Sequence, residues 1–337
     1  MPQHHVSHPR GSDLGPRSVL LEGRFGRMFR NLPSFLPPDT ALEAVANSMV
    51  EPADSGQGGG WAPSGGDLDS DIPAGYTYLG QFIDHDITFD PVSSLQRQND
   101  PDALHDFRTP RFDLDSLYGG GPNNSPYMYD PDVDGGRTTL LIGRNETGEE
   151  DLPRNVLSAD SLGEPRGRAL IGDPRNDENI IVSQLHLIFV KFHNAVVERV
   201  RSEQPSLSPD HLFEEAQRVV RWHYQWIVVH DFLPRVCGEE VVLDILKPDG
   251  GNYFARGGEV TFPAFRLRFY GWRRQPYMPV EFSVAAYRFG HSMIRPTYKI
   301  NDPVPELPIF SPNPTPGRFE AFHGFRPLPP RWTIDWA

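Results

Sequence analysis

The chain is poor in cysteine, in positive charge and in long apolar runs. Cys237 is the only cysteine among 337 residues, so no disulfide can form within the chain and a reducing compartment is permitted. The 32 lysine and arginine residues are outnumbered by 45 aspartate and glutamate residues. The resulting net charge of −13 argues against a nucleic-acid partner and against an anionic membrane surface.

A membrane span and a secretory leader are not predicted. No apolar run reaches transmembrane length, and residues 1–18 contain no apolar segment typical of a signal peptide. We therefore expect a soluble protein, cytoplasmic or secreted without a recognisable signal, whose oligomeric state stays open. The 31 glycines and 35 prolines predict many loops. We expect a flexible arm over residues 1–20 and one domain over residues 21–337.

The stretch Gly80–Asp86 places four polar side chains in an apolar segment. Apolar residues recur there at helical spacing, namely Tyr76, Leu79, Phe82 and Ile83. In the short buried helix that this predicts, Gln81 and His85 share a face, Asp84 borders that face and Asp86 points elsewhere. Burying such groups is costly unless they find partners. The stretch is either a helix end with a core histidine and solvated acids, or a functional site.

Oxygen-bearing side chains are concentrated in the loop at residues 109–119. Alternate residues of an extended loop point the same way, so Thr109, Asp113 and Asp115 can converge. Carboxylates, a hydroxyl and backbone carbonyls are the ligands that calcium prefers, although such a loop is often only a solvated turn. If the loop folds back against Asp86, a calcium site is favoured.

A long helix is predicted after residues 172–179, with apolar residues along one stripe. Arg175 and Glu178 lie at its start. They serve either as a surface cap and a favourable helix-dipole charge, or as an arginine delivered to a buried site. His186 and His193 within the helix are expected to be packing or surface residues.

A second long helix is predicted to begin at Ser208 and Pro209 and to end near Phe232. His223 and His230 lie seven residues apart and share a face. With no third ligand nearby, hydrogen bonding in the core is favoured over a zinc site. Elsewhere, a capping box predicts a short helix over residues 40–49, and a hairpin is predicted around residues 137–144.

The stretch Val284–Ile294 surrounds one histidine with small and apolar residues. Gly290 directly precedes His291 and leaves room for a flat group to approach the backbone. An imidazole in such a helix is either structural or an axial ligand of haem iron.

Four of these stretches together resemble the animal-type haem peroxidases, the peroxidase–cyclooxygenase superfamily. They occur in the family's order, at residues 80–86, 109–119, 172–179 and 287–296. The resemblance covers roughly residues 20–337 in a compact, bacterial-looking form. It implies a mainly α fold with long loops, little β structure and haem held between helices. The family domain continues beyond this length, so we expect the C-terminal part to be missing, including the asparagine that orients the proximal histidine.

The resemblance also implies the roles of individual residues around haem b. Gln81 and His85 become the distal pair, Arg175 the distal arginine and His291 the proximal iron ligand. The haem-binding set is completed by three further residues, namely Asp84, Glu178 and Arg288. The first two occupy positions that form ester links to haem in mammalian members.

The implied calcium ligands come from the helix and from the loop. They are Asp86, Thr109, the carbonyl of Arg111, Asp113 and Asp115, of which the last replaces the usual serine. Asn179 stands where myeloperoxidase has a sulfonium-forming methionine, so that link is absent and chloride oxidation is not expected.

The expected activity is reduction of hydrogen peroxide, with oxidation of bromide, iodide, thiocyanate or phenolic donors, in a response to oxidative stress. One alternative is a haem fatty-acid dioxygenase, which would need a radical tyrosine where this chain has Arg288, one residue from Tyr287. The other is a degenerate, non-enzymatic binding protein.

Overall fold

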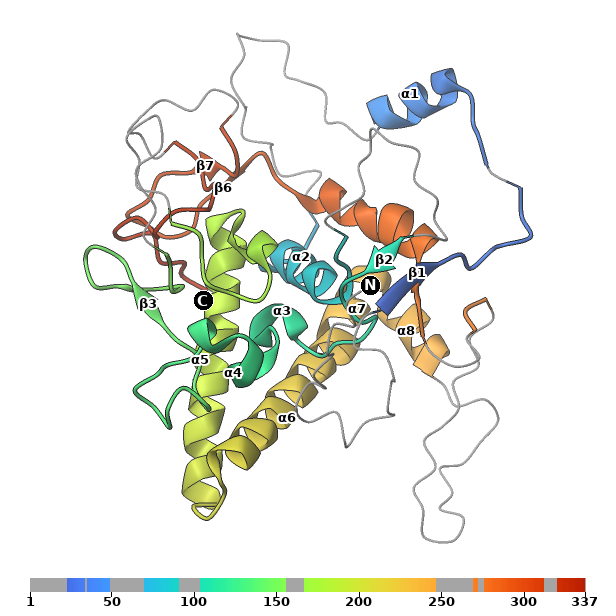
Figure 1. Cartoon of the computed structure of the whole chain (residues 1–337). Coiled ribbons are helices and arrows are strands. Elements are labelled where there is room, and N and C mark those ends of the chain that lie inside the picture. The colour runs from blue at the N-terminus through green and yellow to red at the C-terminus, as the bar shows by residue number, and fades with distance from the viewer. Residues whose placement is uncertain are drawn as a thin grey trace, which may run out of the picture.

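The computed structural model describes most of the chain and shows a mainly helical fold (Figure 1). The described residues are 23–33, 35–48, 70–90, 104–155, 167–246, 269–271, 276–311 and 320–336. The expected arm over residues 1–20 lies outside them.

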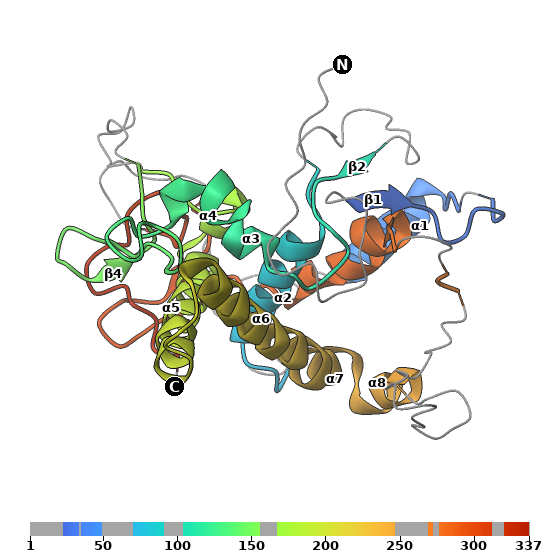
Figure 2. The same cartoon turned by 60° about the horizontal axis from the view of Figure 1, so that its bottom comes forward.

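Two long helices pack against each other at the centre of the fold (Figures 1 and 2). They are α5 (Ile180–Glu203) and α6 (Pro209–Ile227). The side chain of Asn179 accepts hydrogen bonds from the first backbone amides of α5, and Ser208 caps α6 with Pro209 in its first turn. Both predicted helices are confirmed. The chain then continues through three short helices, η4 (Val228–Phe232), α7 (Leu233–Cys237) and α8 (Glu239–Leu246).

By length and composition α5 could cross a membrane, which the sequence analysis did not anticipate. However, 67% of its most apolar window is buried inside the fold. A helix that is apolar on most sides and covered by its own protein is a core helix.

The helix α2 (Gly75–Ile87) packs against both long helices. Phe82 at its centre is fully buried, stacks on Phe189 of α5 with ring centroids 4.8 Å apart, and meets Tyr224 of α6 edge-on at 6.0 Å. Truncating such a core aromatic residue typically costs about 3–5 kcal/mol. The predicted short buried helix is therefore confirmed, and its C-terminal turn, which carries His85, is anchored by the core.

A second segment lies along α2 and consists of η5 (Glu281–Ala285) and η6 (Ala286–Met293), drawn in orange in Figure 1. The hydroxyl of Tyr287 donates to the carbonyl of Gly80 at 2.9 Å, and Thr77 donates to the carbonyl of Met293 at 3.3 Å. These bonds place the segment with His291 next to the helix with His85.

The remaining elements are short. The helices among them are α1 (Asp39–Ser48), α3 (Asp115–Tyr118), α4 (Gly121–Asn124), η2 (Pro126–Met128) and η3 (Pro174–Asp177). The helix α1 confirms the prediction for residues 40–49. Strand β1 (Gly23–Gly26) pairs antiparallel with β2 (His105–Asp106) and parallel with β5 (Met278–Pro279). A further pair joins β6 (Thr297–Tyr298) to β7 (Leu307–Pro308).

The predicted hairpin lies later than expected. Its paired strands are β3 (Gly143–Arg144) and β4 (Glu150–Asp151), not residues around 137–144. The side chain of Asn145 explains the shift, because it accepts hydrogen bonds from the backbone amides of Thr147 and Glu149 and so closes the turn.

Candidate functional site

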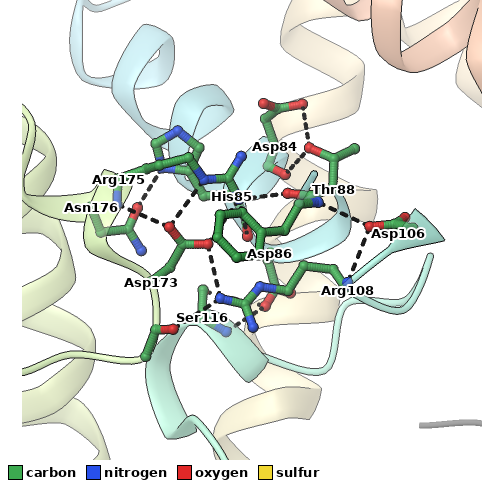
Figure 3. Close-up of polar contacts among 12 residues, drawn as sticks. Asp84, His85, Asp86, Thr88, Asp106, Arg108, Ser116, Asp173, Arg175 and Asn176 are labelled. Carbon is green, nitrogen blue, oxygen red and sulfur yellow. Dashed lines mark hydrogen bonds and ion pairs between the residues drawn. The ribbon is translucent and has the colours of Figure 1, made fainter. Parts of the chain in front are cut away.

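The imidazole of His85 lies in the last turn of α2 and is only 6% exposed (Figure 3). Its Nδ1 atom is 2.7 Å from Oδ1 of Asn176 in η3. Burial, helped by the charge of Arg175, lowers the pKa of His85 to about 3. His85 is therefore a neutral imidazole at physiological pH, and one ring nitrogen has a lone pair that can accept a proton.

The guanidinium of Arg175 is fixed against the end of α2. Its Nη2 atom donates to the backbone carbonyls of His85 at 3.1 Å and Thr88 at 2.5 Å. Its Nε and Nη2 atoms also contact the two carboxylate oxygens of Asp173 at 3.0 and 2.8 Å. Among the described residues, its Nη1 atom has no hydrogen-bond partner, and 27% of the side chain is exposed. Arg175 can therefore still offer a donor to a bound group.

Asp173 joins Arg175 to a second arginine. Arg108 donates to Asp173 at 2.9 Å, and both guanidinium groups lie over the ring of Phe89, 5.3 and 4.8 Å from its centroid. Burial alone would raise the pKa of Asp173, but hydrogen bonding and the charges of both arginines outweigh it and lower the pKa to about 2. The carboxylate of Asp173 is thus charged at physiological pH and holds the guanidinium of Arg175 in place through hydrogen bonds.

Gln81, Glu178 and Asn179 form a chain of hydrogen bonds beside His85. Gln81 donates from Nε2 to the carboxylate of Glu178, and Asn179 donates to Oε1 of Gln81 at 3.2 Å. Glu178 is therefore held by Gln81.

The carboxylate of Asp84 faces the segment with His291. It accepts a hydrogen bond from the hydroxyl of Thr88 at 3.2 Å, and Nη1 of Arg288 is 3.9 Å away. Burial raises the pKa of Asp84 and of Glu178, and the charge of His291, when it is protonated, would lower both. The contact with Arg288 places Asp84 next to the segment that carries His291.

His291 is exposed in η6, whereas the sequence placed it in an apolar pocket. Its Nδ1 atom lies 3.0 Å from the carbonyl of Arg288 and, as a donor there, leaves the lone pair on Nε2. A Cβ atom added at Gly290 would meet no described atom within 4 Å. The face next to Gly290 is therefore open among the described residues.

On the far side of α2, Asp86 meets the loop before α3. Its two oxygens accept hydrogen bonds from the amide of Leu114 at 3.1 Å and from the amide and hydroxyl of Ser116 at 3.4 and 3.3 Å. The loop therefore folds back against Asp86, which meets the condition that the sequence analysis set for a calcium site. Thr109 donates to Oδ2 of Asp113 at 2.5 Å, while Oδ1 of Asp113 is buried without a hydrogen-bond partner.

Three carboxyl groups gather there at high electrostatic cost. Burial and the negative charge of Asp115 raise the pKa of Asp86 to about 7. Burial, Asp115 and Asp86 raise the pKa of Asp113 well above its usual range. The side chains of the described residues form no ready-made set of three or more histidine, cysteine or acidic metal ligands. The cluster nevertheless concentrates charge that a cation would stabilise.

Of the four further histidines considered in the sequence analysis, only His186 contacts a residue of this site. His186 and His193 are buried in α5, which confirms the packing role expected for them, and His186 contacts Asn176. His223 and His230 are exposed, so the expectation that they bond in the core is wrong. His223 donates to the carbonyl of Val219 at 2.8 Å, and His230 lies on Trp226.

The family model for animal haem peroxidases matches residues 96–315, which is more than half of the chain. This chain belongs to the animal haem peroxidase family. The matched range includes Arg175 and His291 and begins after His85.

Individual relatives agree with this assignment. A peroxidase-like protein of Margaritifera margaritifera is 32% identical over 124 residues, which is 37% of this chain and 14% of that protein. Human thyroid peroxidase is 30% identical over 135 residues, or 40% of this chain and 12% of that protein. The chain thus matches a small part of the length of these relatives.

Peroxidase A of Dictyostelium discoideum has a similar structure, with a TM-score of 0.51 and 15% identity over 90% of this chain and 60% of that one. This likeness confirms the mainly α, animal-peroxidase fold expected from the sequence.

Two residues around the candidate site were missed by sequence reasoning. Arg108 directly precedes the recognised stretch 109–119, and Asn176 lies within the stretch 172–179. Their positions next to motif residues were the only signal, because Arg108 contacts Gly172, 64 positions away, and Asn176 contacts His85, 91 positions away. Such pairing becomes visible only in the fold.

Proposed function

We propose that this chain acts as a haem-dependent peroxidase that reduces hydrogen peroxide and oxidises small anions, such as bromide, iodide or thiocyanate, or phenolic donors. The observation that carries the proposal is the neutral, buried imidazole of His85 beside the clamped guanidinium of Arg175. A proton acceptor next to a fixed positive charge is what cleavage of a peroxide bond requires.

The residues around His291 are the ones that we propose would hold haem. Nε2 of His291 would ligate the iron, while the Nδ1 contact with the carbonyl of Arg288 orients the ring. The open face at Gly290 leaves room for a flat macrocycle. Asp84, Glu178 and Arg288 would border it. When bound, haem would supply the iron that receives peroxide and the electrons for its reduction.

The chain's own residues would handle the protons and the charge. His85 accepts one proton from hydrogen peroxide at its free ring nitrogen and returns it to the departing oxygen, which leaves as water. Such general acid–base catalysis typically contributes about 10²–10⁴-fold. Arg175 stabilises the negative charge that develops on the departing oxygen. Gln81, oriented by Glu178 and Asn179, would position the peroxide or a halide.

Calcium would join α2 to the loop at residues 109–115. The proposed ligands are oxygens of Asp86, Thr109, Arg111 (backbone), Asp113 and Asp115. The buried, unpartnered Oδ1 of Asp113 and the mutual repulsion of the three carboxylates support a cation there. Because Asp86 directly follows His85, the ion would hold the helix turn that carries the imidazole.

Ester links between the protein and haem are the most specific part of the proposal. Asp84 is buried, Glu178 is half-buried, and both carboxyl groups have raised pKa values, so esterification would remove a costly charge. Acidified organic solvent extracts free haem but not ester-linked haem. After peroxide cycling, haem should resist this extraction. If all haem is still released, both carboxylates act only through charge and hydrogen bonding.

A direct test of the function uses the purified chain with added haem. A Soret band together with peroxide-dependent oxidation of iodide, bromide or a phenol is the expected result. Absence of both would favour the non-enzymatic alternative. A Soret band with oxygen-dependent oxidation of a fatty acid, and no peroxide turnover, would favour the dioxygenase.

A further inference from the structure

A buried hydrogen-bond chain runs from His85 through Asn176 to His186. Nδ1 of His85 is 2.7 Å from Oδ1 of Asn176, and Nδ2 of Asn176 is 3.1 Å from Nδ1 of His186. Asn176 and His186 are completely buried, and Nε2 of His186 has no partner among the described residues.

The carboxamide gives this chain a direction. Its oxygen only accepts and its nitrogen only donates, so Oδ1 requires a proton on Nδ1 of His85. Nδ2 of Asn176 donates to Nδ1 of His186. The neutral ring of His186 must then carry its own proton on Nε2. A neutral imidazole has one proton, so a protonated Nδ1 leaves the lone pair of His85 on Nε2. If the amide of Asn176 were flipped, its Nδ2 would donate to Nδ1 of His85. The imidazole proton would then be on Nε2, which could not accept a further proton.

We propose that Asn176 is a positioning residue that fixes the tautomer and ring orientation of His85. The consequence for catalysis rests on the proposed peroxidase function. Nε2 of His85 takes the peroxide proton, the resulting imidazolium keeps its Nδ1 proton on Oδ1 of Asn176, and Nε2 then returns the proton. Asn176 and His186 are unchanged at the end of the cycle.

A purely structural role for Asn176 would predict a different pattern of effects. Asparagine, aspartate and leucine have nearly the same shape, so Asn176→Asp and Asn176→Leu form a matched pair. Asn176→Asp keeps the acceptor that faces His85, whereas Asn176→Leu removes it. If Asn176 only fills space, the two variants should leave the protonation pattern of His85 alike.

The primary measurement needs no haem. Nuclear magnetic resonance of the chain containing nitrogen-labelled histidine reports which ring nitrogen of each histidine carries the proton, and His85→Gln identifies the signal of His85. We expect a protonated Nδ1 in the wild type and in Asn176→Asp, and a mixture of tautomers in Asn176→Leu. In the haem-loaded protein, Asn176→Leu should react with peroxide on the order of 10–100-fold more slowly, and Asn176→Asp should recover much of the rate.

A wild-type His85 protonated on Nε2 would overturn the proposal even if Asn176→Leu failed to fold. An unchanged tautomer in a folded Asn176→Leu would overturn it as well. These outcomes are distinct from failure of the peroxidase function, which would appear as a protein that binds no haem although His85 has the expected tautomer.

Discussion

Arg175 donates a hydrogen bond from Nη2 to the backbone carbonyl of His85 at 3.1 Å, although the two residues are 90 positions apart. The proton acceptor and the positive charge of the site are therefore held by one contact at the end of α2. Asp173 secures the same guanidinium from the other side. A shift of α2 would move both groups together, so their relative geometry is preserved.

Replacing His85 should separate peroxide cleavage from haem binding. In His85→Gln the ring nitrogens are lost while the residue that would ligate iron, His291, is untouched. We expect a normal Soret band and a rate of reaction with peroxide lower by about 10²–10⁴-fold. Stopped-flow absorbance with peroxide measures this rate. Reaction of the variant at the wild-type rate would mean that another group is the base.

Replacing His291 should abolish haem binding, which the His85 variant should retain. His291→Ala removes the only nitrogen proposed to ligate the iron, so titration with haem should give no Soret band. His230→Ala is a suitable control, because His230 is also exposed and lies on a different helix, η4. A normal haem spectrum in His291→Ala would show that the iron ligand lies elsewhere.

Local parts of this architecture could be predicted because they depend on neighbours in sequence. The helical period around Phe82 predicted α2 and the shared face of Gln81 and His85, and the N-cap at Ser208 predicted where the second long helix begins. His223 and His230 were misjudged, because a spacing of seven residues shows that two side chains share a face and not whether that face is covered.

The contacts that complete the site could not be predicted from spacing. Arg108 meets Asp173, and Asn176 meets His85, only because separate segments pack around α2. Nothing in the pattern near Asn176 distinguishes an amide that contacts a histidine from one that caps a turn. The exposure of His291 depends likewise on which segments cover η6.

Calcium should stabilise the protein through the cluster at Asp86. Free calcium at about 100 times its dissociation constant would raise the free energy of unfolding by about 2.7 kcal/mol, and chelation would reverse the effect. Asp113→Asn removes a proposed ligand and should abolish this rise. Asp132→Asn, at an exposed position, should keep it. Thermal unfolding with calcium and with chelator provides the measurement, and equal responses of the two variants would rule out the site.

The buried histidine His193 should make the folded state sensitive to acid. Its Nδ1 accepts from the hydroxyl of Tyr118 at 3.0 Å, and its Nε2 donates to the carbonyl of Thr138 at 2.8 Å, so the neutral ring is satisfied on both sides. Burial lowers the pKa of His193 from 6.5 to about 4. As the pH falls below 6.5, the unfolded chain binds a proton that the folded chain does not. The stabilisation is complete above pH 6.5 and is lost progressively until about pH 4.

The size of this effect can be isolated by comparing His193→Gln with the wild type at each pH. The variant should be less stable at pH 7, because it loses two buried hydrogen bonds, but its disadvantage should shrink by about 2 kcal/mol at pH 5. Urea unfolding at the two pH values measures the difference, and other titrating groups cancel because both proteins contain them. His223→Gln, at an exposed position of α6, is the matched control and should follow the wild type. If the gap between His193→Gln and the wild type is the same at both pH values, His193 is not the residue that couples folding to pH.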